Sequence, residues 1–470
     1  MRVAIVAESF LPIVNGVVNS VLRVLEYLRR EGHEAIVIAP QPREGFIDSH
    51  YEGFRIARVP AVDLPMINSL PIGVPLPRVY KEIRDFQPDV VHLASPFVLG
   101  GAGVFAARAL HIPCVAVYQT DVPGYTDHYN LKALHKMSWR WVRTMHNNST
   151  LTLAPSSVTI EELEWNGVRN VHHWGRGVDT ERFNPSKRDE QLRAEWLAAG
   201  AAKRGEAEVA GAGEAAGVGA GGGADAGTGA EAGGGAIDPT QRAGSRRIVG
   251  FVGRLAAEKS VDLLAALDGR DNVQLVIVGD GPDRAELERL MPTAVFAGAL
   301  YGEELAIAFA SLDVFVHAGA HETFCQAIQE AQASGLPTIG PRAGGPIDLI
   351  DDGHTGFLLN PATFARDLPS AIDHIISSDA NLGAFGAASL ARVQDRTWPA
   401  LCEQLMGYYE QAILAGPAAA RVGVFVGAGG GAGLGGGGGA AGLGGAGGGV
   451  AGDVGADDAA WGSISARKLR

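Results

Sequence analysis

Short apolar strands alternate with helical patterns in two separate blocks of this chain, and this alternation restricts its fold more than any other feature. The first block opens with an apolar run at 3–7, a helical pattern at 16–30 that ends at Gly32, and a second apolar run at 35–39. Further apolar runs lie in the first block at 54–59, 89–93, 113–117, 151–154 and 171–174, and in the second at 248–252, 274–278, 295–297, 314–317, 338–340 and 356–359. Such strands build parallel sheets that are covered on both faces. We therefore predict an α/β protein of two doubly wound, Rossmann-like domains facing a cleft.

Two Gly/Ala-rich segments set the limits of these blocks. Gly makes up 65 of the 470 residues and is concentrated at 199–236 and 416–470. Such sequence buries too little apolar surface to offset its ordering entropy, so we expect a flexible linker or insertion and a disordered tail. The expected domains are then 1–195 and 245–395, followed by a helix at 396–415 that packs back on the first domain.

Charge and cysteine content exclude several classes of protein. The formal net charge is −13, and the first 190 residues hold 20 Lys+Arg and 20 Asp+Glu, so the acidic excess lies in the remainder. An acidic balance argues against nucleic acid as a partner. Three cysteines are too few for a disulfide framework or a Cys-only zinc site, and they fit a reducing compartment. With no signal peptide and no long apolar span in the sequence, we expect a cytoplasmic protein.

The segment from Glu322 to Glu330 carries the strongest indication of chemistry. We expect 317–321 to be the loop after a strand and 324–333 to be a helix. The unpaired amides at 323–326 would suit a phosphate, and Glu330, two turns into the helix, would accept hydrogen bonds from sugar hydroxyls. A capped helix with two solvated glutamates explains the same residues.

Two cations follow the first strand of the second block. Arg254 and Lys259 come directly after the apolar run at 248–252. Because strand ends in a doubly wound domain face the ligand crevice, both side chains would meet a diphosphate there. An ordinary exposed turn is the alternative interpretation.

A glycine opens the first helix. Gly16 follows Asn15 after the first strand, where backbone amides can approach an anion because no Cβ intrudes. The segment lacks the G-x-G-x-x-G pattern, so a dinucleotide site is unsupported. A helix-initiating turn explains Gly16 equally well, and turn chemistry explains the glycines at 279–282.

Taken together, these motifs resemble the retaining GT-B glycosyltransferases with an E-x7-E motif, glycosyltransferase family 4. The resemblance covers most of 1–195 and 245–415. It rests on PIVNGVVNSV, RGVDTERFNP, VGRLAAEKS, VGDGP, the Glu322–Glu330 segment and GGPIDLIDDGHTGFL. Within that family the chain looks like GDP-mannose-dependent α-mannosyltransferases that act on lipid acceptors.

The resemblance implies a role for each matching residue. Gly16 would approach the donor, Arg254 and Lys259 would neutralise its diphosphate, and Glu330 would hold the ribose. Glu322 would bind the donor sugar together with the amides of Thr323, Phe324 and Cys325, the backbone from Gly298 to Leu300 would meet the base, and Arg176 of the RGVDTERFNP motif would contact substrate. No metal cofactor is implied, since the cations and the helix terminus stabilise the leaving diphosphate.

One departure from the family pattern concerns proton transfer. Many relatives carry a His where this chain has Gln119. Gln119 can hydrogen-bond sugar hydroxyls but cannot carry a proton, and Asp121 is the nearest ionisable group. We expect Asp121 to take over part of that role, unless it only caps a turn or the leaving phosphate accepts the proton.

A basic helix is expected at 131–146. Lys132, Lys136, Arg140 and Arg143 share one face, and Leu134, Met137, Trp141 and Met145 share the opposite one. Such a helix either docks on anionic lipid headgroups, which would place the protein peripherally on the inner face of the membrane, or packs its apolar face on the sheet as an ordinary surface helix.

Three functions remain open at this point. The first is transfer of mannose from GDP-mannose to a glycolipid or phosphatidylinositol-type acceptor. The second is use of another sugar nucleotide to make a soluble metabolite or a polysaccharide. The third is a non-catalytic protein that binds a sugar nucleotide, although such a protein has no need of Arg254, Lys259, Glu322 and Glu330 together.

Overall fold

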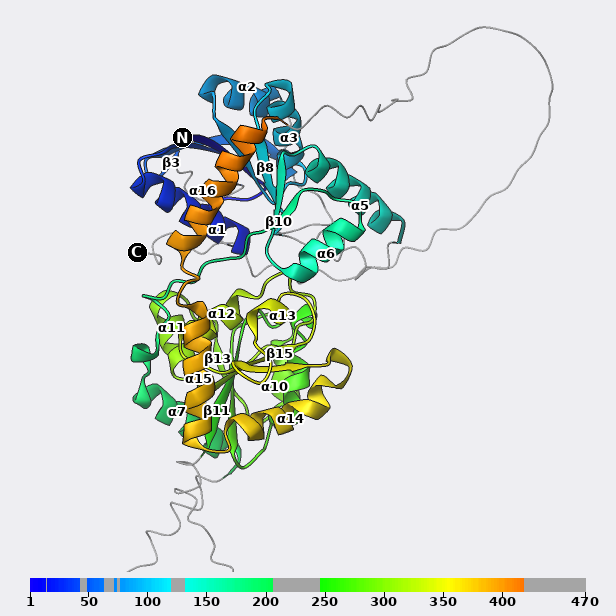
Figure 1. Ribbon diagram of the computed structural model, residues 1–470. Helices are drawn as coiled ribbons and strands as arrows, with labels where there is room; N and C mark the ends of the chain where they lie inside the picture. The colour runs from blue at the N-terminus through cyan, green and yellow to red at the C-terminus, as the bar shows by residue number, and fades with distance from the viewer. Residues whose placement is uncertain are drawn as a thin grey trace, which may run out of the picture.

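The computed structural model describes residues 1–13, 15–42, 49–62, 72–73, 77–119, 132–205 and 246–417. They form two lobes, each built on one parallel sheet with helices on both faces, as Figure 1 shows. The predicted α/β class with two doubly wound domains is confirmed. Among the described residues, no helix is both long and apolar enough to cross a membrane.

The first sheet has eight strands, and all neighbours are parallel except the edge pair β3–β4. In spatial order they are β10 (Val171–His173), β9 (Leu151–Ala154), β8 (Cys114–Val117), β7 (Val90–Ala94), β1 (Arg2–Ala7), β2 (Glu34–Pro40), β4 (Phe54–Val59) and β3 (His50–Tyr51). A separate antiparallel pair is formed by β5 (Ala61–Val62) and β6 (Ile72–Gly73). In β1, Val3 and Ile5 enter one core while Ala4 and Val6 enter the other. Both faces are therefore buried, which is why the strand reads as a continuous apolar run.

The helices of the first lobe are α1 (Gly16–Arg30), α2 (Pro77–Phe86), α3 (Leu99–Ala109), α5 (Lys132–Asn147) and α6 (Ser157–Trp165). The α1 helix has the expected bounds because Asn15 caps it: its side chain accepts hydrogen bonds from the amides of Val17 and Val18. In α5 the buried face is made by Trp139, Val142 and Met145. Met137, expected on the packed face, is instead 60% exposed.

The second sheet has six parallel strands. Their order is β13 (Val295–Gly298), β12 (Val273–Val278), β11 (Arg247–Val252), β14 (Val314–Val316), β15 (Thr338–Pro341) and β16 (Gly356–Leu359). Its helices are η2 (Ala257–Lys259), η3 (Val261–Leu267), α10 (Arg284–Leu290), α11 (Gly302–Ala310), α12 (Gln326–Ala333), α13 (Pro346–Leu349), η4 (Pro361–Thr363), α14 (Phe364–Ile375) and α15 (Asp379–Val393). As in the first sheet, alternate residues of β11 enter different cores.

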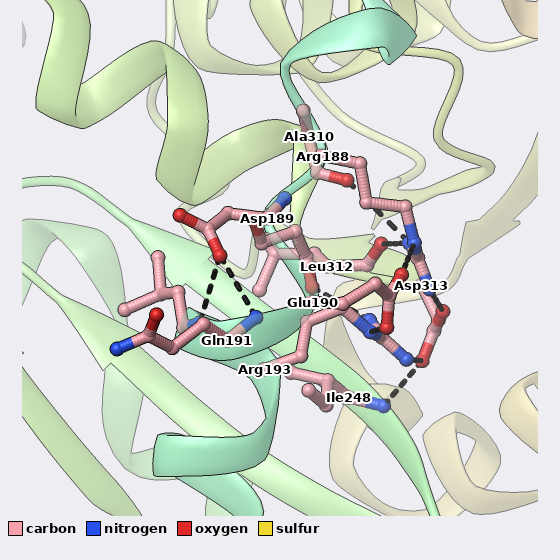
Figure 2. Close-up of polar contacts among 11 residues, drawn as sticks. Arg188, Asp189, Glu190, Gln191, Arg193, Ile248, Ala310, Leu312 and Asp313 are labelled. Atoms are coloured by element: carbon pink, nitrogen blue, oxygen red, sulfur yellow. Dashed lines mark hydrogen bonds and ion pairs between the residues drawn. The ribbon is translucent and has the colours of Figure 1, made fainter.

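The segment with η1 (Pro185–Lys187) and α7 (Glu190–Lys203) packs on the second lobe. Arg188 and Arg193 each place a guanidinium nitrogen 3.0 Å from an oxygen of Asp313, which is nearly fully buried, and the amide of Ile248 donates to the same carboxylate at 2.8 Å (Figure 2). The structure thus differs from the expected domain boundary at 195: that boundary falls inside α7, whose Trp196 belongs to the second core. The change of lobe comes earlier in the chain, because Asp313 anchors this segment.

The final helix, α16 (Trp398–Ala415), returns to the first lobe and packs on α1 (Figure 1). The indole of Trp174 donates to the carbonyl of Leu401 at 2.8 Å, and the hydroxyl of Tyr409 lies 2.7 Å from Nδ1 of His92. Two stretches of chain, before η1 and before α16, therefore connect the lobes, and they pair where Val178 bridges Thr397. Most of the expected linker and nearly all of the expected tail, residues 206–236 and 418–470, lie outside the described residues.

Candidate active site

An ion pair stands at the carboxyl ends of the central strands of the second sheet. Lys259 ends η2, the single turn that follows β11, and its Nζ donates to Oε1 of Glu322, which follows β14. Burial works to lower the pKa of Lys259, but the neighbouring Glu322 carboxylate outweighs it, so that the pKa is raised. Lys259 is therefore held in its charged form beside Glu322.

The backbone after Glu322 takes an unusual conformation. Cys325 has φ 76°, a left-handed value that is rare for residues other than glycine, and α12 begins only at Gln326. The helix thus starts two residues later than the expected 324. Thr323, Phe324 and Cys325 form the turn that leads into it, and the first amides of such a helix have no partner inside the helix.

Two glycines support this turn from behind. Gly345 donates its amide hydrogen to the carbonyl of Glu322 at 2.7 Å, and a Cβ on Gly345 would lie 2.3 Å from the carbonyl oxygen of Phe324. A Cβ on Gly344, which has φ 58°, would lie 2.5 Å from the carbonyl oxygen of Glu322. No larger residue fits at these positions without moving the turn, which explains the Gly-Gly pair in the sequence.

Glu330 lies on α12 beside the chain that connects the lobes. Burial raises the pKa of Glu330 to about 8, with Arg182 opposing the rise and Asp179 adding to it. Asp179 in turn lies 3.0 Å from the guanidinium of Arg23 on α1. Two charged residues, Arg182 and Asp179, therefore act on Glu330, and Asp179 pairs with α1 of the first lobe.

Arg176 connects residues of the first lobe with Glu322 of the ion pair. Its Nη1 lies 2.6 Å from the position that a Cβ on Gly16 would occupy, and its Nη2 donates to Oε1 of Gln119 at 3.4 Å. Burial lowers the pKa of Arg176 to about 10, and Glu322 opposes that shift. The bare face of Gly16 is thus covered by a guanidinium that also lies in the field of Glu322.

Arg254 and Gly298, two other expected site residues, have contacts outside the ion pair. The Arg254 side chain is 50% exposed, and its guanidinium lies 3.8 Å from Glu258. Gly298 ends β13 with φ 76°, and its carbonyl accepts the amide hydrogen of Gly279 at 2.8 Å. Leu300 follows two residues later, and Asp121 lies outside the described residues.

His317 is a neighbour of Glu322 that the sequence did not single out. It is 2% exposed, and its Nε2 lies 3.5 Å from Oε1 of Glu322. Together with Cys325 these side chains place three potential metal ligands within 4.8 Å of one another. They could hold a transition metal, but Lys259 already occupies the same carboxylate oxygen, and burial raises the pKa of the Cys325 thiol.

Two parallel-sheet lobes joined in this way, with the cations and carboxylates at strand ends, define the class of GT-B glycosyltransferases. Comparison with known families and structures agrees. The model "Glycosyltransferase Family 4" matches residues 14–182 and "Glycosyl transferases group 1" matches 246–378. The chain belongs to the glycosyltransferase family that these two models describe, and it is a transferase.

Several known proteins are similar over most of their length. The GDP-mannose-dependent alpha-mannosyltransferase of Corynebacterium glutamicum is 52% identical, covering 88% of this chain and 89% of its own. The protein of that name from Mycolicibacterium smegmatis is 48% identical, covering 87% of this chain and 97% of its own. Among solved structures, sucrose-phosphate synthase from Thermosynechococcus elongatus has a TM-score of 0.65 at 18% identity, covering 88% of this chain and 99% of its own, which shows the shared fold.

Proposed function

We propose that this protein transfers mannose from GDP-mannose to a lipid acceptor with retention of anomeric configuration. The similarity to the two GDP-mannose-dependent mannosyltransferases supports the donor. A further relative, 25% identical over 80% of this chain, is a phosphatidylinositol dimannoside mannosyltransferase of Mycobacterium tuberculosis, which supports a lipid acceptor. The structural observation that carries the proposal is the Lys259–Glu322 ion pair, with the left-handed residue Cys325 three positions after Glu322.

The donor diphosphate meets the second lobe in this proposal. Lys259 and Arg254 neutralise its charge, and the amides of the turn at Thr323, Phe324 and Cys325 donate to its oxygens. These groups stabilise the charge that grows on the leaving diphosphate as the glycosidic bond breaks. No metal ion is needed, because the cations and the helix N-terminus supply the positive charge.

The rest of the donor is held on either side of the diphosphate. Glu330 accepts hydrogen bonds from the ribose hydroxyls, and Glu322 accepts them from the mannose. The backbone from Gly298 to Leu300 meets the guanine. From the first lobe, Gly16 and Arg176 reach the phosphate and Gln119 reaches a sugar hydroxyl.

The acceptor proton has two destinations in this proposal. Gln119 cannot take it, since an amide is not a base at neutral pH. The proton passes either to the leaving phosphate, which lies on the same face as the incoming hydroxyl in a retaining transfer, or to Asp121. Replacing Asp121 by Asn separates the two, because only the second route loses its base.

A membrane surface is the partner that we propose for the α5–α6 edge of the first lobe. Lys136, Arg140 and Arg143 of α5 are exposed, as is Met137. Trp165, the last residue of α6, is 91% exposed. Exposed cations and an exposed methionine on α5, with an exposed tryptophan at the end of α6, suit the headgroup region of an anionic bilayer, with the protein bound peripherally on the cytoplasmic face.

A donor panel tests the proposal. GDP-mannose, UDP-glucose and ADP-glucose are each supplied with anionic vesicles that contain the acceptor lipid, and nucleotide release is measured. We expect release with GDP-mannose that depends on the vesicles. Turnover with a water-soluble acceptor alone would favour the alternative, a transferase that makes a soluble metabolite or polysaccharide.

A further inference from the structure

His317 stands between the two loops that carry the Lys259–Glu322 ion pair. It follows β14 directly, and its imidazole stacks on Phe251 of β11, with ring centroids 6.3 Å apart and planes 14° apart. Phe251 itself is fully buried. The ring is therefore fixed in position by the central strands of the sheet.

The imidazole also lies close to the Glu322 carboxylate and to the backbone that carries Lys259. Its Nε2 lies 3.5 Å from Oε1 of Glu322, the oxygen that Lys259 contacts, and among the described residues neither ring nitrogen has a hydrogen-bond partner, so this carboxylate oxygen is the acceptor within reach of an Nε2 hydrogen. A Cβ on Gly319 would lie 3.1 Å from the same Nε2, 2.9 Å from the carbonyl oxygen of Glu258 and 3.3 Å from Cα of Lys259. The missing side chain at Gly319 thus lets the imidazole lie close to the backbone of η2.

The ring is neutral at neutral pH. Burial lowers the pKa of His317 to about 4, with Glu322 opposing the shift and Lys259 adding to it. A charged imidazole would compete with Lys259 for the one carboxylate oxygen. A neutral ring instead presents a ring nitrogen to Glu322 and leaves the negative charge to Lys259.

We infer that His317 is a positioning residue: through Nε2 it fixes the orientation of the Glu322 carboxylate toward Lys259 and the donor sugar. The inference rests on the proposed role of Glu322 in sugar transfer. The orientation of the Glu322 carboxylate then requires a nitrogen at the Nε2 position, and a ring of the same volume without that nitrogen does not suffice.

Three substitutions separate these contributions. His317→Phe keeps the stacking on Phe251 and removes both nitrogens. His317→Gln places an amide nitrogen near the position of Nε2, whereas His317→Asn places one near Nδ1. Each variant is assayed for kcat, for the donor KM and for the melting temperature, with the sugar nucleotide that the unmodified protein turns over fastest in the donor panel.

We expect His317→Phe to lower kcat by about 10- to 100-fold, the cost of misplacing a catalytic group, with a small change in donor KM and in melting temperature. His317→Gln should recover most of the lost kcat, and His317→Asn should not. Wild-type turnover in the Phe variant, or equal turnover in the Gln and Asn variants, would overturn the inference. If the Phe variant does not fold, the comparison of Gln with Asn still decides.

His92 provides a matched control in the first lobe. It is 1% exposed, and burial lowers its pKa to about 4, but it pairs with the hydroxyl of Tyr409, away from the site. His92→Gln should lower the melting temperature and leave kcat unchanged. Failure of the unmodified protein to use GDP-mannose would refute the proposed donor alone, because the variants are compared with whichever donor is turned over.

Discussion

Nζ of Lys259 and Oε1 of Glu322 join two loops of the second lobe that lie 63 residues apart in the chain. Their side chains retain 25% and 19% exposure, so the pair is accessible to a ligand and still shielded from bulk water. In the proposed mechanism the donor diphosphate binds the ammonium group of Lys259, and the Glu322 carboxylate accepts hydrogen bonds from the sugar hydroxyls. In this proposal the pair contacts the substrate in addition to joining the two loops.

Replacing either proposed diphosphate cation should slow transfer strongly. We expect Lys259→Ala and Arg254→Ala each to lower kcat/KM by about 10²-fold or more, since each charged contact to the leaving group stabilises the transition state. Circular dichroism should show intact secondary structure in both. The exposed Lys81 on α2 is the control, and Lys81→Ala should leave kcat/KM unchanged. Near-wild-type turnover of either site variant would contradict its assignment.

Gly16→Ala should act through Arg176. The added Cβ would lie 2.6 Å from Nη1, the flexible end of the arginine, so the guanidinium moves while the fold stays intact. We expect donor KM to rise about tenfold, the loss of one charge-assisted contact. A double-mutant cycle with Arg176→Ala measures how far the effect of Gly16→Ala on donor KM depends on Arg176. Gly16→Ala should have little further effect on donor KM once the Arg176 side chain is removed. Additive effects would show that Gly16 acts independently of Arg176.

Much of the fold could be predicted because its cause is local. The run in β1 and the Asn15 cap of α1 are short-range signals, and they gave elements close to the observed bounds. The left-handed Cys325 could not be foreseen, since the turn before it packs against Gly344 and Gly345, about 20 residues further along the chain. His317 could not be singled out for a similar reason: it stands where the expected strand 314–317 meets the expected loop 317–321, and its proximity to Glu322 arises from tertiary packing. A histidine at the end of an apolar strand was the one available signal.

Chelation should not stop the reaction. Lys259, Arg254 and the α12 terminus supply the positive charge in the proposed mechanism, so EDTA should leave most of the transfer rate. The measurement is nucleotide release after dialysis against EDTA, with and without added Mg²⁺ or Mn²⁺. Loss of activity that returns with a divalent ion would refute the metal-free mechanism.

The Asp313 anchor should matter for stability and little for chemistry. Its carboxylate, 3% exposed, is shared by Arg188, Arg193 and the amide of Ile248 (Figure 2). Asp313→Ala removes the buried carboxylate that both guanidinium groups share and leaves them only Glu190, which is exposed, and backbone carbonyls, so we expect a loss of about 3–5 kcal/mol in the free energy of unfolding. Urea denaturation measures it. Donor KM of the folded fraction should stay unchanged, and a stability within 1 kcal/mol of wild type, roughly the effect of an exposed pair, would show that the network is weak.

Glu330 should make stability depend on pH in a defined direction. Burial raises its pKa from an ordinary 4.5 to about 8 in the folded protein. The unfolded chain therefore loses this proton near pH 4.5 while the folded protein keeps it, and stability falls as pH rises from about 4.5 to 8. Glu330→Gln removes the titration, so the melting temperature of the variant should rise relative to wild type across this range in the absence of nucleotide. Glu164→Gln, at an exposed position of α6, is the matched control for the loss of one carboxylate. A difference between Glu330→Gln and wild type that stays constant from pH 5 to pH 8 would show that Glu330 is already ionised at the lower pH, and that Arg182 compensates its burial fully.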